Sequence, residues 1–120
     1  MKGYTSETIR NVALLGHGGC GKTTFLESAL YETGVIKKLG KVDDGNTVSD
    51  YDKMEIEKGY SINTSVVPIE WKDSKINFID TPGYFDFVGE VNAAMRAAEA
   101  AVILVDAGAG VQVGTEAAWN

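Results

Sequence analysis

Short apolar runs alternate along the chain with segments of helical spacing. Residues 11–15, 75–79 and 101–105 are mainly apolar and end at a glycine or an aspartate, as buried strands often do before a turn. Residues 23–32 and 85–98 repeat apolar side chains at intervals of three and four, which predicts two amphipathic helices. Strands that alternate with helices predict an α/β fold with a mostly parallel sheet.

The helical spacing also predicts which side chains face the core. The expected inward side chains are Phe25, Leu26, Ala29 and Leu30 on the first helix, and Val88, Val91, Met95 and Ala98 on the second. Gly34 follows the first helix at a position where glycine commonly ends one.

Two further segments depart from this alternation. Residues 62–71 predict a fourth strand that contains Pro68. Proline cannot donate a hydrogen bond to a ladder, so we expect this strand at a sheet edge. Residues 35–59 are polar and lack a clear period, and a loop of this length in a compact domain is usually functional or mobile.

Composition narrows the class of protein. The 120 residues suit one small domain, and 44% hydrophobic with 23% charged residues is ordinary for a globular protein. A net charge of -6 argues against a direct grip on nucleic acid by this segment. The single cysteine, Cys20, excludes an internal disulfide and favours a cytoplasmic location. No membrane span or signal peptide is evident, so no membrane partner is expected.

Residues 16–23 match the phosphate-binding loop pattern in full, between a predicted strand and a predicted helix. Glycines allow backbone N–H groups to approach a triphosphate, and the following helix directs the positive end of its dipole at the anion. Lys22 would supply a charge to the β- and γ-phosphates, and Thr23 a hydroxyl to Mg²⁺. A chance glycine-rich turn is the alternative, and the strand–helix context disfavours it. We expect the side chains of His17 and Cys20 to fill the loop rather than to bind metal or act as nucleophiles.

A second candidate motif is Asp80-Thr81-Pro82-Gly83, directly after an apolar strand. An aspartate at a strand end is placed to hold Mg²⁺ directly or through water. Pro-Gly is also a plain turn signal, but downstream of a phosphate loop the functional interpretation is preferred. Gly83 would donate its N–H to the γ-phosphate, and loss of that phosphate would release the loop. The expected nucleotide-binding residues are Gly16, His17, Gly18, Gly19, Cys20, Gly21, Lys22, Thr23, Thr24, Asp80 and Gly83.

Several motifs in order resemble the elongation factor G family. They are Arg10-Asn11-Val12, the phosphate loop, residues 55–62, residues 79–84, Asp86-Phe87, Glu90-Val91, Val105-Asp106-Ala107, Val111, Glu116 and Trp119. The resemblance covers nearly the whole chain. It implies a P-loop NTPase fold of three layers, with a mostly parallel sheet and helices on both faces. Residues 1–120 would be the N-terminal part of its GTPase domain, with further strands and the base-binding loops expected after Asn120.

The resemblance implies GTP or GDP and Mg²⁺ as ligands, and GTP hydrolysis on the ribosome during translocation. Its implied metal ligands are Thr23, Ser61 and Asp80, and its implied catalytic residues are Lys22, Gly83 and Tyr84. This chain departs from the family at several positions: Ser61 replaces a usual Thr, Tyr51 a Trp, Tyr84 a His, Cys20 an Ala and Gly19 an Asp. Because that Asp is associated with a monovalent cation, we do not expect the ion here.

The sequence leaves several alternatives open. The guanine-recognition pattern Asn-Lys-x-Asp is absent. Residues 40–43 imitate only its second half, and they lie before the segment around Ser61 that would act as the first switch. A ribosomal protection or release-factor-recycling paralogue would share this front end. A nucleotide-binding switch module with weak hydrolysis, or a different P-loop ATPase, are further possibilities. Neither Arg10 nor Arg96 is placed like an arginine finger, so we expect slow hydrolysis without a partner.

Overall fold

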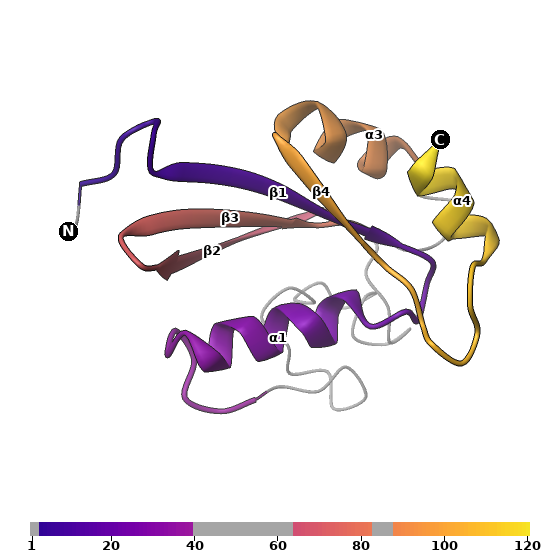
Figure 1. Ribbon diagram of the computed structural model, residues 1–120, viewed down its shortest axis with the longest axis horizontal. Coiled ribbons are helices and arrows are strands. Elements are labelled where there is room, and N and C mark those ends of the chain that lie inside the picture. The colour runs from indigo at the N-terminus through magenta and orange to yellow at the C-terminus, as the bar shows by residue number, and fades with distance from the viewer. Residues whose placement is uncertain (1–2, 40–63, 83–87) are drawn as a thin grey trace.

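The computed structural model describes residues 3–39, 64–82 and 88–120. Within these residues a four-stranded sheet has helices on both faces (Figure 1). The elements in chain order are β1 (Ile9–Gly16), α1 (Lys22–Glu32), β2 (Ser65–Trp71), β3 (Ser74–Asp80), α3 (Val88–Ala97), β4 (Ala100–Leu104) and α4 (Val113–Trp119). This arrangement confirms the expected three-layer α/β fold.

The sheet has the strand order β2-β3-β1-β4. β1 pairs in parallel with β3 and with β4, and β2 pairs antiparallel with β3. The proline-containing strand β2 therefore lies at an edge, as its Pro68 predicts. Lys72 and Asp73 form the turn between β2 and β3 with φ angles of 46° and 64°. Positive φ at both turn residues suits the right-handed twist of a hairpin.

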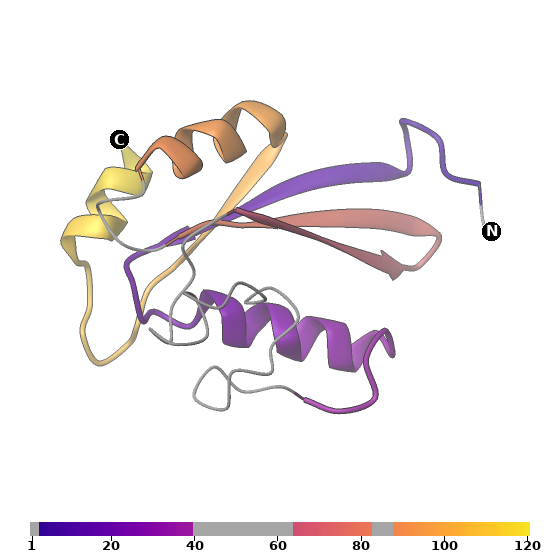
Figure 2. The same ribbon diagram turned by 180° about the vertical axis from the view of Figure 1, so that it is seen from behind.

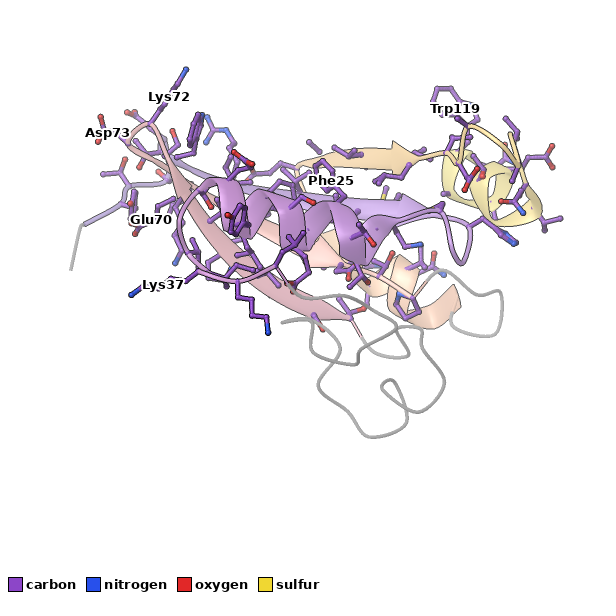
Figure 3. The ribbon with its side chains drawn as sticks, turned by 90° about the horizontal axis from the view of Figure 1, so that it is seen from below. Phe25, Lys37, Glu70, Lys72, Asp73 and Trp119 are labelled. Atoms are coloured by element: carbon purple, nitrogen blue, oxygen red, sulfur yellow. The ribbon has the colours of Figure 1, made fainter. Side chains whose placement is uncertain are left out.

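Helix α1 covers one face of the sheet, as Figure 3 shows from that side. Its Leu26 and Leu30 are buried against Leu14 of β1 and against Val67 and Ile69 of β2; these five side chains form the core cluster of this face. Full burial of such a side chain contributes about 1.5–3 kcal/mol. The predicted inward positions Leu26 and Leu30 are therefore confirmed, and Ala29 packs at the margin of the same cluster.

Phe25 belongs to the same predicted stripe but lies at its border. Its ring meets Phe78 of β3 edge-on, with ring centroids 6.0 Å apart and an interplanar angle of 82°. One side of the ring still faces solvent, and the residue is 40% exposed. Phe25 therefore closes the margin of the core instead of filling it.

Helices α3 and α4 cover the opposite face, as both views of the ribbon show (Figures 1 and 2). Side chains alternate along a strand, so the buried Ala13 and Leu15 of β1 point to this side while Leu14 points to α1. The expected inward position of Met95 is wrong: Met95 is 44% exposed, whereas Ala94 is only 2% exposed. A small side chain at the contact allows the helix backbone to approach the sheet closely.

The other three side chains expected to face inward from this helix differ in burial or lie outside the described residues. Val91 and Ala98 are half-buried, and the side chain of Val88 lies outside the described residues. Residues 85–87, the first turn of the predicted helix, also lie outside them.

Helix α4 has no counterpart among the predicted elements. A compact turn after β4 leads into it, and the carboxylate of Asp106 accepts hydrogen bonds from the N–H groups of Gly108 (2.7 Å) and Ala109 (3.0 Å). The bond from Ala109, and then that from Gly108, hold the pKa of this carboxyl below its usual value. Because this pKa is lower in the folded chain, the ionised carboxylate stabilises the turn at pH values above its unfolded pKa. This contribution is lost as the pH falls through the folded-state pKa.

An apolar groove lies beside β4. A hollow of about 550 Å³ is lined by Ile103, Val105, Val111, Thr115, Glu116, Trp119 and Asn120. Trp119 at its rim is 82% exposed. Among the described strands β4 pairs only with β1, so its other edge presents main-chain N–H and C=O groups.

We predict that the isolated 120-residue chain self-associates through the open edge of β4. Pairing with a second copy would satisfy the main-chain groups and cover the groove. Light scattering over a concentration series should show a rising average mass. Val102→Lys, which places a charge on this strand, should lower that mass. A cooperatively melting monomer at every concentration would contradict the prediction.

Candidate nucleotide-binding site

The predicted phosphate loop lies at the carboxyl edge of the sheet. β1 ends at Gly16, and α1 begins at Lys22, so residues 17–21 turn the chain from the central strand into the helix. The parallel neighbours β3 and β4 end at the same edge, at Asp80 and Leu104. Ligands of open α/β sheets bind outside the carboxyl ends of their strands.

Glycines give the loop a backbone that other residues would resist. Gly16, Gly19 and Gly21 have φ angles of 149°, 81° and 99°, all in the left-handed region. Gly16 is also constrained by space, because a Cβ there would lie 2.6 Å from the carbonyl oxygen of Leu104 and 2.7 Å from Sγ of Cys20. The loop can therefore follow this path only with glycine at its first position.

The amino end of α1 opens onto the loop. Gly21 occupies the N-cap position in a left-handed conformation, and no side chain among the described residues caps the helix there. The first intrahelical bond runs from the N–H of Phe25 to the carbonyl of Gly21, at 2.8 Å. An 11-residue helix directs its positive dipole end toward this point, which favours an anion.

Lys22 lies inside the loop and not in solvent. The residue is only 6% exposed. Its Nζ donates hydrogen bonds to the carbonyl oxygens of Gly16 (3.0 Å) and His17 (3.3 Å), and lies 3.7 Å from Sγ of Cys20. The ammonium group is thus held where the loop wraps around it, in the loop where the sequence predicts a phosphate-binding lysine.

The structure brings together two of the three predicted metal-binding residues. The hydroxyl of Thr23, at the start of α1, donates to a carboxylate oxygen of Asp80 at the end of β3, at 3.3 Å. Asp80 is buried at this point. Hydroxyl and carboxylate oxygens are the hard ligands that Mg²⁺ takes, usually with several retained waters. The donor set therefore fits the metal.

Three of the predicted site residues are not among those that the structure describes. Ser61, Gly83 and Tyr84 lie outside the described residues, as do Tyr51 and residues 40–43. In the part of the chain that the structure describes, no three His, Cys, Asp or Glu side chains cluster as a metal site.

Thr81 is a contributor that the sequence analysis missed. Its buried hydroxyl donates to the carbonyl oxygen of Leu14, at 2.6 Å. Leu14 and Asp80 are the last register pair between β1 and β3, so this side-chain bond extends the contact one residue beyond the ladder. It fixes Asp80 relative to the start of the phosphate loop. A threonine directly after a strand-end aspartate was the available signal.

Comparison with known proteins identifies the class to which this arrangement belongs. Residues 7–120 match the family described as the elongation factor Tu GTP binding domain, and the chain belongs to that family. The resemblance to elongation factor G is confirmed as well. Over 114 residues, 95% of this chain and 16% of the relative, it is 48% identical to an elongation factor G from Granulibacter bethesdensis.

Two other similarities frame the comparison. The chain is 47% identical over 112 residues to the mitochondrial ribosome-releasing factor 2 of Danio rerio, covering 93% of this chain and 15% of that protein. A crystal structure of a Thermus thermophilus protein superposes with a TM-score of 0.91 at 46% identity, covering 93% of this chain and 17% of that one. The chain thus spans about a sixth of the length of these relatives. None of the described helices is long and apolar enough to cross a membrane.

We predict that Thr23→Val weakens Mg²⁺-dependent nucleotide binding. The variant removes the hydroxyl but keeps the branched shape of the side chain. In the full-length protein, the gain in GTP affinity on adding Mg²⁺ in place of a chelator should fall by about tenfold, or about 1.4 kcal/mol. Thr23→Ser retains the hydroxyl and should keep the gain. Equal Mg²⁺ dependence in Thr23→Val and the parent would refute the metal assignment.

Proposed function

We propose that residues 1–120 form the N-terminal part of a GTP-binding and GTP-hydrolysing domain, in a translation factor that acts on the ribosome in translocation. The observation that carries the proposal is the buried ammonium group of Lys22, enclosed by a glycine loop at the amino end of α1. The names of the relatives supply guanine nucleotide and the ribosome as the partners. A cytoplasmic location belongs to the same proposal.

In this proposal the loop binds the triphosphate through its own groups. Lys22 exchanges its carbonyl partners, Gly16 and His17, for phosphate oxygens, which carry more negative charge. Hydrogen bonds between two charged groups are shorter and stronger than those to a neutral carbonyl. The N–H groups at the start of α1 and the helix dipole add stabilisation that needs no rearrangement of the helix.

Mg²⁺ bound with the nucleotide would neutralise charge on the β- and γ-phosphates. Thr23 would provide a hydroxyl ligand, together with Ser61 in the triphosphate state. Asp80 would act from the outer shell, through water. The hydrogen bond between Thr23 and Asp80 supports this division, because it already places the carboxylate beside the hydroxyl.

Hydrolysis would depend on Gly83 and Tyr84. Gly83 would donate its N–H to the γ-phosphate, and the Tyr84 hydroxyl would orient the attacking water. A phenol can donate and accept hydrogen bonds, but it lacks the positive charge that an imidazole can carry. Since phosphoryl transfer relies on positioning and charge stabilisation, we infer slow hydrolysis without the ribosome.

A second candidate is a factor resembling the ribosome-releasing relatives. The 47% identity to such a protein nearly equals the 48% identity to elongation factor G. Both functions share the nucleotide site, so ribosome-stimulated phosphate release would not separate them, whereas translocation and ribosome-recycling assays would. Weak hydrolysis with and without ribosomes would favour a nucleotide-binding switch module, and displacement of labelled GTP by ATP would indicate a different P-loop ATPase.

We predict that Lys22→Ala in the full-length protein weakens GTP binding by at least about tenfold, or about 1.4 kcal/mol. The variant removes the cation that the loop encloses. Isothermal calorimetry measures the change. Lys72→Ala provides a matched control, because it removes the same charge from the exposed β2–β3 turn, away from the loop (Figure 3). Equal affinities of Lys22→Ala and the parent would overturn the site assignment.

We also predict that Tyr84→His raises the ribosome-stimulated rate of GTP hydrolysis. By the resemblance to elongation factor G, histidine is the usual side chain at this position. Phosphate release is measured at saturating ribosomes, with Tyr84→Phe as the control that removes only the hydroxyl and should lower the rate. An unchanged or lower rate in Tyr84→His would mean that Tyr84 is fully competent or has another role.

A further inference from the structure

A hydrogen bond joins the phosphate loop to α4 across most of the sequence. Nδ1 of His17 accepts from the backbone N–H of Gly114 at 3.0 Å, and the two residues are 97 positions apart. As an acceptor, Nδ1 carries no proton, so the neutral ring has its proton on Nε2. The loop is thereby attached to a helix on the face opposite α1.

Helix α4 has a physical need for this acceptor. The first N–H groups of any helix lack partners within the helix. In α4, the N–H of Gln112 donates to the Thr115 hydroxyl at 3.3 Å, and the N–H of Glu116 makes the first intrahelical bond, to the carbonyl of Gln112, at 3.0 Å. The N–H of Gly114 lies in the first turn, and His17 supplies its acceptor. His17 therefore caps α4 from a distant part of the chain.

The two residues also fit each other sterically. A Cβ at position 114 would lie 2.8 Å from both Cα and Nδ1 of His17. Real Cβ atoms essentially never approach other atoms so closely. Because the Cα of His17 belongs to the loop backbone, a larger residue at 114 would displace the loop itself and not only a side chain.

Within the phosphate loop, the backbone of His17 is also held by hydrogen bonds. Its carbonyl oxygen accepts from Nζ of Lys22 at 3.3 Å and from the N–H of Cys20 at 3.2 Å. When Lys22 turns toward a phosphate, it gives up the first of these bonds. The bond to Gly114 does not involve Lys22, so it can hold the loop in both arrangements.

We propose that His17 is a positioning residue for nucleotide binding, and that its bond to Gly114 keeps the phosphate loop in its binding conformation. This inference rests on the proposed nucleotide-binding function. A loop that is already ordered loses less conformational entropy when the ligand binds, and its affinity is correspondingly higher. The side chain acts through the loop backbone and does not itself contact the phosphates.

The test is a double-mutant cycle on GDP and GTP affinity in the full-length protein. The variants are His17→Ala, Gly114→Ala, the double variant and His17→Asn. Loss of one neutral hydrogen bond corresponds to roughly three- to tenfold weaker binding in His17→Ala. His17→Asn should recover most of the affinity, because its side-chain oxygen can accept in place of Nδ1.

The expected signature is non-additivity. Gly114→Ala should weaken binding when His17 is present, because the new methyl group collides with it. In the His17→Ala background the same change should cost less, because the collision with Nδ1 and the hydrogen bond are gone while the contact with the Cα of residue 17 remains. A purely structural role would lower the melting temperature of each variant and leave nucleotide affinity unchanged among the folded proteins. That outcome, or additive losses of affinity, would overturn the inference.

Lys22→Ala, measured in parallel, distinguishes failure of the proposed nucleotide-binding function from failure of the proposed role of His17. Normal binding by Lys22→Ala would mean that the proposed function has failed, whatever the His17 variants show. Weak binding by Lys22→Ala combined with parental affinity in His17→Ala would leave the proposed function intact and refute only the role of His17.

Discussion

The close approach of Gly16 to the end of β4 is the constraint on which the site depends. A Cβ at position 16 would lie 2.6 Å from the carbonyl oxygen of Leu104, so only glycine fits where the central strand ends. This contact sets the direction in which the chain leaves the sheet. Everything after it follows from that direction: the reversal through Gly19 and Gly21, the start of α1 at Lys22, and the enclosure of the Lys22 ammonium group.

The neighbouring strands complete the arrangement from both sides of β1. On one side, Thr81 bonds to the Leu14 carbonyl and holds Asp80 beside Thr23. On the other side, the turn after β4 returns the chain to α4, where a backbone N–H meets the His17 ring. The loop is therefore supported by β3, β4 and α4, all of which are far from it in the sequence. Its local charge opposes the chain's net charge of -6, so an anion must be attracted by the loop and the helix dipole and not by the surface as a whole.

The sequence predicted what depends on short-range order and missed what depends on packing across the sheet. The strands, helix α1 and the phosphate loop have periodic or glycine signals within about ten residues, a span over which helix and strand periods are expressed. The placement of Ala94 in preference to Met95 depends on how closely α3 approaches the sheet, which no helical period specifies. Helix α4 is seven residues long and includes a glycine and two β-branched residues, so its intrinsic helix signal is weak. The partners of Thr81 and His17 lie 67 and 97 residues away and meet them only through the register of β1 with its neighbours.

Gly19 shows how a departure from the family pattern can be judged on physical grounds. The resemblance to elongation factor G implies that an aspartate is usual at this position. The φ of 81° favours glycine, although aspartate tolerates the left-handed region better than most residues, and a Cβ at Gly19 would meet nothing within 4 Å. Packing therefore does not exclude an aspartate here. Its replacement by glycine removes backbone strain and also removes one negative charge from a loop that is proposed to bind a triphosphate. The removed negative charge favours the anion, and it offsets part of the loss of any cation that the carboxylate would have held.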